Sequence, residues 1–214
     1  WEKHLFAAIG EGREPRKVAE EEKGLSFARC LRATAAARMQ GLGPDAAIAY
    51  TGLAFLNLYL NFSGFSDIAI GSAMLFNLRL TENFHFPLIA HSIQNFWQRW
   101  HLSLAAFITR SMFKPMVRRT GRPVVALIIT FTLIGMWHEV SLGYLVWGLA
   151  HGSALGITLW WRTRRGTRPT LLPPFVMRWG GVVVTLAFVS FLSTLANLPT
   201  LGRMHDYLGA LIGV

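Results

Sequence analysis

The feature that most constrains this chain is a run of 21 residues without a charged side chain, from Ala46 to Ser66. A helix needs about 20 mostly apolar residues to cross the hydrocarbon core of a bilayer. Further uncharged runs occupy 123–137, 140–161 and 179–196. Backbone polar groups in lipid must be paired within their own segment, so these runs are expected to be helices. The sequence predicts an all-α, polytopic transmembrane protein with re-entrant or tilted helices around a buried polar tunnel.

The composition supports the same class. Hydrophobic residues make up 52% of the 214 residues and charged residues only 15%, whereas a soluble domain carries about 25% charge. Disordered chains are rich in charge and poor in aromatics, so this composition excludes them. The single cysteine, Cys30, excludes an intrachain disulfide framework.

The positive charge lies beside the apolar runs. Of the net charge of +10, residues 1–45 contribute +1 and residues 46–214 contribute +9. Basic residues that flank membrane spans set orientation and meet anionic lipid, so we expect a lipid bilayer as partner and no nucleic acid. If 123–161 is a helical hairpin, two basic clusters lie on one side, which the positive-inside rule makes cytoplasmic. The clusters are Arg110, Lys114, Arg118, Arg119 and Arg122, and Arg162, Arg164, Arg165, Arg168 and Arg178.

The chain divides into two regions by composition. Residues 1–45 mix charges with a small-residue stretch and are expected to form a surface or linker helix region. Residues 46–214 are expected to form the membrane core, with a second helix over 63–80 that carries one buried carboxylate, Asp67. Because the chain begins at Trp1 and apolar runs start abruptly at residue 46, we expect a fragment of a longer chain; the alternative is a processed mature protein.

His138 is the most informative single residue. It follows a 15-residue apolar run that rises only about 22 Å as a helix, less than the roughly 30 Å of a bilayer core. His138 and Glu139 are therefore expected inside the membrane, where ionisable groups are costly and mark functional pathways. The alternative is a core histidine bonded to a carbonyl of a neighbouring helix.

A second histidine belongs to an aromatic segment. Trp97, Trp100, His101 and Leu104 have the spacing of one helix face. With Asn95 and Arg99 nearby, this face suits the wall of a polar tunnel; the alternative is a packing stripe. His151 lies between small residues that permit close helix approach, and it is interpreted as more structural than catalytic. No metal-ligand spacing occurs, so no metal is predicted.

Five ordered motifs resemble those of the bacterial membrane-bound O-acyltransferases, most nearly the alginate O-acetyltransferase branch. The similarity is strong over residues 50–152 and fainter over 207–213. The motifs are Phe62-Ser-Gly-Phe-Ser-Asp-Ile-Ala-Ile-Gly71, Glu82-Asn-Phe-His-Phe-Pro87, Ser92-Ile-Gln-Asn-Phe-Trp-Gln-Arg-Trp-His-Leu-Ser103, Gly135-Met-Trp-His138 and Leu145-Val-Trp-Gly-Leu-Ala-His-Gly152.

The resemblance implies a multi-pass enzyme of the bacterial inner membrane. Such an enzyme moves an acetyl or other acyl group from a cytoplasmic thioester to a hydroxyl of a cell-envelope polysaccharide or of its extracytoplasmic relay protein. The expected donor is acyl-coenzyme A, and no bound cofactor is expected. The family's invariant histidine corresponds to His138 and its second active-site histidine to His101. Because family members are longer and carry several spans upstream, the resemblance implies that residues 46–214 are the central and C-terminal part of the acyltransferase core.

Substrate-binding roles are expected for residues around these histidines. They are Asn95, Trp97, Arg99, Trp100, Asp67 and Glu139. Glu139 departs from the glycine that usually follows the family's catalytic histidine; its carboxylate either favours the imidazolium form of His138 or turns away to pair with an arginine. The alternative to an enzyme is a membrane transporter or pore component that uses intramembrane histidines for proton or solute passage.

Overall fold

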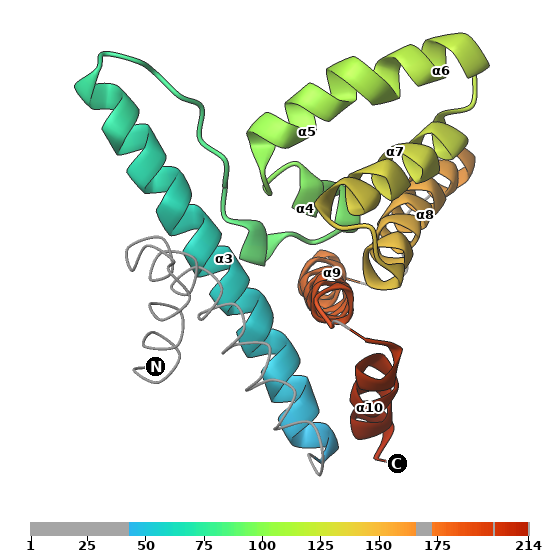
Figure 1. Cartoon of the computed structure of the whole chain (residues 1–214). Coiled ribbons are helices and arrows are strands. Elements are labelled where there is room, and N and C mark those ends of the chain that lie inside the picture. Colours follow the sequence, from blue (N-terminus) through green and yellow to red (C-terminus); the bar gives the residue numbers. More distant parts are fainter. Residues whose placement is uncertain (1–42, 166–172, 199, 214) are drawn as a thin grey trace, which may run out of the picture. The chain divides into compact units, whose positions relative to one another are not determined.

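The computed structural model describes residues 43–165, 173–198 and 200–213 (Figure 1). Every regular element in these ranges is helical, and strand-like pairing is limited there to one isolated bridge, Phe84 with Trp100. The predicted all-α class is therefore confirmed for the described part. The surface helix predicted before residue 41 lies outside it. Residues 48–199 form one compact unit, whereas 43–47 and 200–213 belong to a second.

The described helices fall into a long and a short group. The long ones are α3 (Pro44–Leu75), α7 (Pro123–His138), α8 (Leu142–Arg165) and α9 (Pro174–Ala196). The short elements are a 3-10 turn η1 (Pro87–Ile89), α4 (Ile93–Trp97), α5 (Leu102–Ile108), a π-helical turn η2 (Thr109–Phe113), α6 (Lys114–Thr120) and α10 (Leu201–Ile212).

Three of the described helices are long and apolar enough to cross a bilayer. They are α3, α8 and α9, whereas α7 is apolar but shorter. The 16 residues of α7 rise only about 24 Å, less than the thickness of a bilayer core. This short length is consistent with the expectation that His138, the last residue of α7, lies within the membrane. The chain is a multi-pass membrane protein.

The prediction of two helices over 46–66 and 63–80 is wrong, because the structure has one continuous helix, α3. A single glycine inside a helix costs only about 1 kcal/mol, so Gly64 does not break it. Asp67 also lies inside α3, and its side chain is exposed rather than buried within the described residues. The carboxylate therefore neither starts a helix nor sits in the interior of this part of the chain.

Helix α3 ends well before residue 80, at a C-terminal cap in which Asn77 takes the position usually held by glycine. Asn77 adopts the left-handed conformation at φ 57°. Its N–H bonds to the carbonyl of Met74 at 3.0 Å, and the N–H of Leu78 bonds to that of Ala73 at 3.0 Å. These two bonds form a Schellman motif, in which asparagine substitutes for the usual glycine. Residues 76–80 thus leave the helix that the sequence predicted to include them.

Helices α7 and α8 form the predicted hairpin. They lie side by side in Figure 1, and glycines of α8 face the backbone of α7. A Cβ atom on Gly148 would lie 2.5 Å from the carbonyl oxygen of Phe131, and one on Gly152 would lie 2.7 Å from the Cα of Ile128. Small residues allow helices to approach this closely in a membrane. The sequence-based interpretation of the residues around His151 is confirmed on this point.

The second unit contributes α10 to the described residues. The Thr200 side chain caps its start by accepting a hydrogen bond from the N–H of Arg203 at 3.4 Å. Gly213, in the left-handed conformation at φ 78°, ends it. Tyr207 and Ala210 are buried and the rest of the helix is largely exposed, as in an amphipathic helix.

Candidate active site

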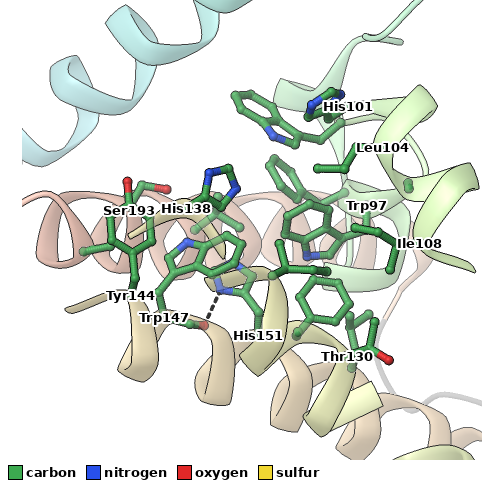
Figure 2. Close-up of a pocket in the computed structure, with 18 of the residues that line it drawn as sticks. Trp97, His101, Leu104, Ile108, Thr130, His138, Tyr144, Trp147, His151 and Ser193 are labelled. Atoms are coloured by element: carbon green, nitrogen blue, oxygen red, sulfur yellow. Dashed lines mark hydrogen bonds between the residues drawn. The ribbon is translucent and has the colours of Figure 1, made fainter. Parts of the chain in front are cut away.

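The compact unit of residues 48–199 encloses a cavity of about 400 Å³. Its walls come from α3, α4, α5, η2, α7, α8 and α9 and from the turn before α5. Most of the lining side chains are aromatic or aliphatic, and the polar ones are a minority (Figure 2). The polar or ionisable lining side chains are Gln94, Gln98, His101, Thr109, Thr130, His138, Tyr144, His151, Ser193 and Asn197. An apolar cavity with a few placed polar groups is typical of small-molecule sites.

His101 reaches this cavity from a sharp turn and not from a helix face. Helix α4 ends at Trp97, and α5 begins only at Leu102. His101 is the N-cap of α5, with left-handed backbone angles of φ 47° and ψ 57°. The prediction that Trp97, Trp100 and His101 share one helix face is therefore wrong, although all three side chains line the cavity. Strained non-glycine backbone of this kind clusters at functional sites.

Backbone pairing with the segment 83–85 holds that turn in place. The N–H of Leu102 donates to the carbonyl of Asn83 at 3.0 Å, and the N–H of His85 donates to that of Arg99 at 2.9 Å. Two extended pieces of chain thus lie antiparallel at the one isolated bridge of the described residues. The turn of His101 is set by tertiary pairing, which a periodicity argument on residues 97–104 alone does not detect.

The side chain of Asn83 fixes the tautomer of His101. Its Oδ1 accepts from the hydroxyl of Ser103 at 2.6 Å and from the N–H of Ser103 at 3.3 Å. Its Nδ2 donates to the hydroxyl of Ser66 at 3.0 Å. The same Oδ1 lies 3.2 Å from Nδ1 of His101, and because Oδ1 only accepts, Nδ1 carries the proton. In neutral His101 the Nε2 atom is then a hydrogen-bond acceptor.

The surroundings of His101 favour that neutral form. Burial lowers its pKa below the usual value of 6.5, and the electrostatic effect of His138 across the cavity lowers the pKa further. The ring of Phe62 packs edge-on against it with centroids 4.8 Å apart. His101 is therefore an uncharged acceptor at neutral pH.

His138 ends α7 at another part of the cavity wall. Its ring stacks on Tyr144, with centroids 5.7 Å apart, and meets Trp147 edge-on at 6.0 Å. Figure 2 shows the three side chains together, with His101 elsewhere on the rim. His138 is exposed within the described part of the chain, and its expected depth in the membrane stays a prediction. In that part its ring nitrogens make no hydrogen bond, so the imidazole is free to exchange a proton.

The structure divides the predicted site residues into two sets. Trp97 and Trp100 line the cavity with the two histidines, but Asn95, Arg99, Asp67 and Glu139 do not. The Nε of Arg99 donates to Oδ1 of Asn95 at 3.0 Å, and an Nη1 hydrogen bonds to the carbonyl of His85 at 3.0 Å. Asn95 and Arg99 therefore stabilise the turn before α5 from outside the cavity. Glu139 is exposed and pairs with no arginine among the residues described.

Sequence reasoning missed several lining groups. Tyr144 and Asn197 meet across α8 and the end of α9, with the phenol donating to the amide oxygen at 3.4 Å. Trp147 lies between His138 and His151. Asn83 belongs to one of the family-like motifs, but its contact with His101 spans 18 residues and forms only in the folded chain. Among the described residues, no three side chains of metal-ligand type come together.

Comparison with known proteins places the chain in a family. The family model of membrane-bound O-acyltransferases matches residues 46–198, which include all the lining residues of the cavity. The chain belongs to the membrane-bound O-acyltransferase family. Its resemblance to that family, seen in the motifs, is confirmed.

The chain is also similar to individual curated proteins, which are named for three different substrates. The chain is 35% identical over 164 residues to the probable alginate O-acetylase AlgI of Pseudomonas syringae pv. tomato, covering 74% of this chain and 30% of that protein. It is 38% identical over 103 residues to the peptidoglycan O-acetyltransferase of Helicobacter pylori, an alignment that covers 47% of this chain and 20% of that protein. It is 29% identical over 104 residues to the teichoic acid D-alanyltransferase of Bacillus subtilis, an alignment that covers 44% of this chain and 26% of that protein. The aligned part is less than a third of the length of each relative.

Proposed function

We propose that the protein containing this chain is an O-acyltransferase that moves an acyl group from a thioester to a hydroxyl inside the membrane. The observation that carries the proposal is that two histidines from separate elements, His101 and His138, line one apolar cavity. Membership of the membrane-bound O-acyltransferase family supports this reaction class. The relatives named for alginate and peptidoglycan support an acetyl donor and an envelope glycan acceptor.

In the proposed reaction, His138 is the general base. It takes the proton of the acceptor hydroxyl while the oxygen attacks the thioester carbonyl. The tetrahedral intermediate collapses with loss of the thiolate, and the imidazolium of His138 returns the proton to the departing sulfur. The products are an ester and a free thiol, and no external oxidant or reductant is needed. The unpaired ring nitrogens of His138 within the described residues suit this role.

His101 is the positioning partner. Because Asn83 holds its proton on Nδ1, the Nε2 lone pair accepts a hydrogen bond from a second hydroxyl of the acceptor, separate from the hydroxyl that His138 deprotonates. A neutral His101 also avoids placing a second positive charge beside His138 when that residue becomes protonated. A hydrogen bond to His101 keeps the acceptor oriented toward the thioester, which lowers the entropic cost of reaching the reactive geometry.

The thioester is proposed to enter from the side of the basic clusters. Arg118 and Arg119 are exposed at the end of α6, which continues from the η2 turn that lines the cavity. Their charge suits the phosphates of an acyl-coenzyme A donor. The proposed location is the inner membrane of a bacterium, with the acceptor arriving from the opposite side.

The test is acyl transfer by the full-length protein in proteoliposomes. Radiolabelled acetyl-coenzyme A is supplied on one side, and alginate or peptidoglycan fragments are supplied on the other. Incorporation of label into the glycan by the wild type, and its loss in His138→Gln, would support the proposal. Proton or solute flux across the same vesicles without any acylation would instead support the transporter alternative.

A further inference from the structure

We propose that the cavity contains a polar subsite, formed by the indole N–H of Trp97 and the Nε2 atom of His151, that binds a neutral substrate group able both to donate and to accept a hydrogen bond. Such groups are hydroxyls and secondary amides. The inference rests on the proposed function, because it assigns a part of the acyl-transfer substrates to a place in the same cavity.

His151 is the first half of the subsite. It is fully buried, with 0% of its side chain exposed, and its Nδ1 lies 3.0 Å from the carbonyl oxygen of Trp147 (Figure 2). A carbonyl oxygen only accepts, so Nδ1 carries the proton and Nε2 has the lone pair. This Nε2 has no hydrogen-bond partner among the described residues. It is a buried acceptor on the wall of the cavity.

Trp97 is the second half. Its Nε1, which only donates, is also buried without a partner in the described part of the chain. The ring lies against His151 with centroids 5.6 Å apart and planes at 80°. A buried polar atom without a partner costs about 1–3 kcal/mol. Two such atoms, one donor and one acceptor, on adjacent side chains of one cavity therefore indicate a ligand.

The packing around the subsite keeps it dry and rigid. Phe131 stacks on His151 at 6.4 Å, and Phe188 contacts it at 5.2 Å. Helix α8, which carries His151, is pressed against α7 through Gly148 and Gly152, one turn before and one residue after the histidine. Hydrogen bonds in such apolar surroundings are stronger than in water.

One donor and one acceptor side by side favour a neutral ligand. A carboxylate or phosphate would meet one N–H and one repelling lone pair, and an alkyl group would leave both atoms unpaired. A buried water makes 2–4 hydrogen bonds, most often about three, so water also fits the pair and is the competing occupant that the test must reject. Hydroxyls and secondary amides match both atoms. The two sources in the proposed reaction are an amide of the pantetheine arm of the donor and a hydroxyl of the acceptor.

The experiment measures binding to the full-length protein in lipid nanodiscs. The donor probe is S-acetonyl-pantetheine, in which a thioether ketone replaces the thioester so that no acyl group can be transferred, together with its analogue in which the amide nearest the sulfur is an ester. The acceptor probe is an alginate oligosaccharide. The variants are Trp97→Phe, which removes the N–H and keeps an aromatic ring, and His151→Phe. The matched control is Trp179→Phe, an exposed residue of α9 outside the cavity lining.

For a donor amide, Trp97→Phe should weaken binding of the amide probe roughly three- to tenfold, as for one lost hydrogen bond. The ester analogue should bind the wild type weakly, because it lacks the N–H that His151 accepts, and it should be nearly insensitive to His151→Phe. For an acceptor hydroxyl, oligosaccharide binding alone should weaken. Unchanged binding of both probes in Trp97→Phe, or a substrate-bound structure with an ordered water only between the two side chains, would overturn the subsite.

A second readout does not depend on His151→Phe folding correctly. In the wild type labelled with ¹⁵N-histidine, the Nε2 resonance of His151 should have the position of an unprotonated nitrogen and should shift when the bound probe donates to it. Probe binding that behaves as expected in a wild type that transfers no acyl group would keep the subsite and reject the proposed function.

Discussion

The Nδ1 atom of His101 lies 3.2 Å from Oδ1 of Asn83, an oxygen that already accepts two hydrogen bonds from Ser103. This contact fixes which nitrogen of His101 presents a lone pair. It joins two motifs that are separate in the sequence, and it makes Asn83 a positioning residue of the proposed reaction.

Replacement of Asn83 tests this relationship. Asn83→Leu should lower kcat roughly 10- to 100-fold, because no oxygen then holds the proton on Nδ1 of His101 or fixes the orientation of its ring. Asn83→Asp should instead move the pH profile: a carboxylate beside Nδ1 favours the imidazolium and raises the pKa of His101. Since only neutral His101 accepts the substrate hydroxyl, the acid limb of kcat/KM should move to higher pH.

The control for Asn83 is Ser66→Ala. This change removes the acceptor of the Asn83 Nδ2–H but leaves the oxygen that faces His101. Its acid limb should stay at the wild-type position, below the ordinary histidine pKa of 6.5. Equal pH shifts in Ser66→Ala and Asn83→Asp would show that Asn83 acts through packing alone.

His138→Gln is expected to lose acyl transfer at least about 100-fold, as a general base requires. The glutamine amide forms hydrogen bonds but does not accept the proton. The amount of protein in the membrane should stay near the wild-type level, because the side chain is exposed in the described part and loses only its ring contacts with Tyr144 and Trp147. His101→Ala should keep residual turnover. Radiolabel transfer per folded molecule measures both, and wild-type turnover in His138→Gln would remove the general-base assignment.

Two adjacent glycines in α9 should respond in opposite ways to alanine. A Cβ atom on Gly181 would lie 2.3 Å from the carbonyl oxygen of His91, whereas one on Gly180 meets nothing within 4 Å. Overpacking costs about 1–3 kcal/mol, so Gly181→Ala should lower the thermal stability of the detergent-purified protein. Gly180→Ala should leave it unchanged or raise it slightly, since alanine favours a helix. A loss of stability that is the same in both variants would contradict the packing of α9 against residue 91.

The α7–α8 hairpin predicts that Thr120 and Thr163 face the same side of the membrane. Both sit beside basic residues, at the end of α6 and near the end of α8, and the positive-inside rule makes that side cytoplasmic. In a cysteine-free background, Thr120→Cys and Thr163→Cys should both resist a membrane-impermeant reagent in intact cells and react after permeabilisation. Labelling of one position alone in intact cells would contradict the hairpin, and labelling of both would reverse its orientation.

The local sequence determined the class of the protein. Uncharged runs of span length admit only helices in lipid, so the all-α membrane class and the α7–α8 hairpin follow from hydropathy and length. The motif around His138 and its 15-residue apolar run also placed that histidine at the end of a short helix. These properties depend on residues close together in the chain.

Only the tertiary structure decided which side chains share the cavity. The segment 97–104 has helical spacing, but pairing with 83–85 bends it into a turn at His101. Asn95 and Arg99 then bond to each other behind the turn, whereas Asn83 reaches His101. Contacts between distant segments outweigh local propensity, which differs by less than about 1 kcal/mol between ordinary residues. For that reason the class of this protein could be predicted from its sequence, and the Asn83–His101 contact required the fold.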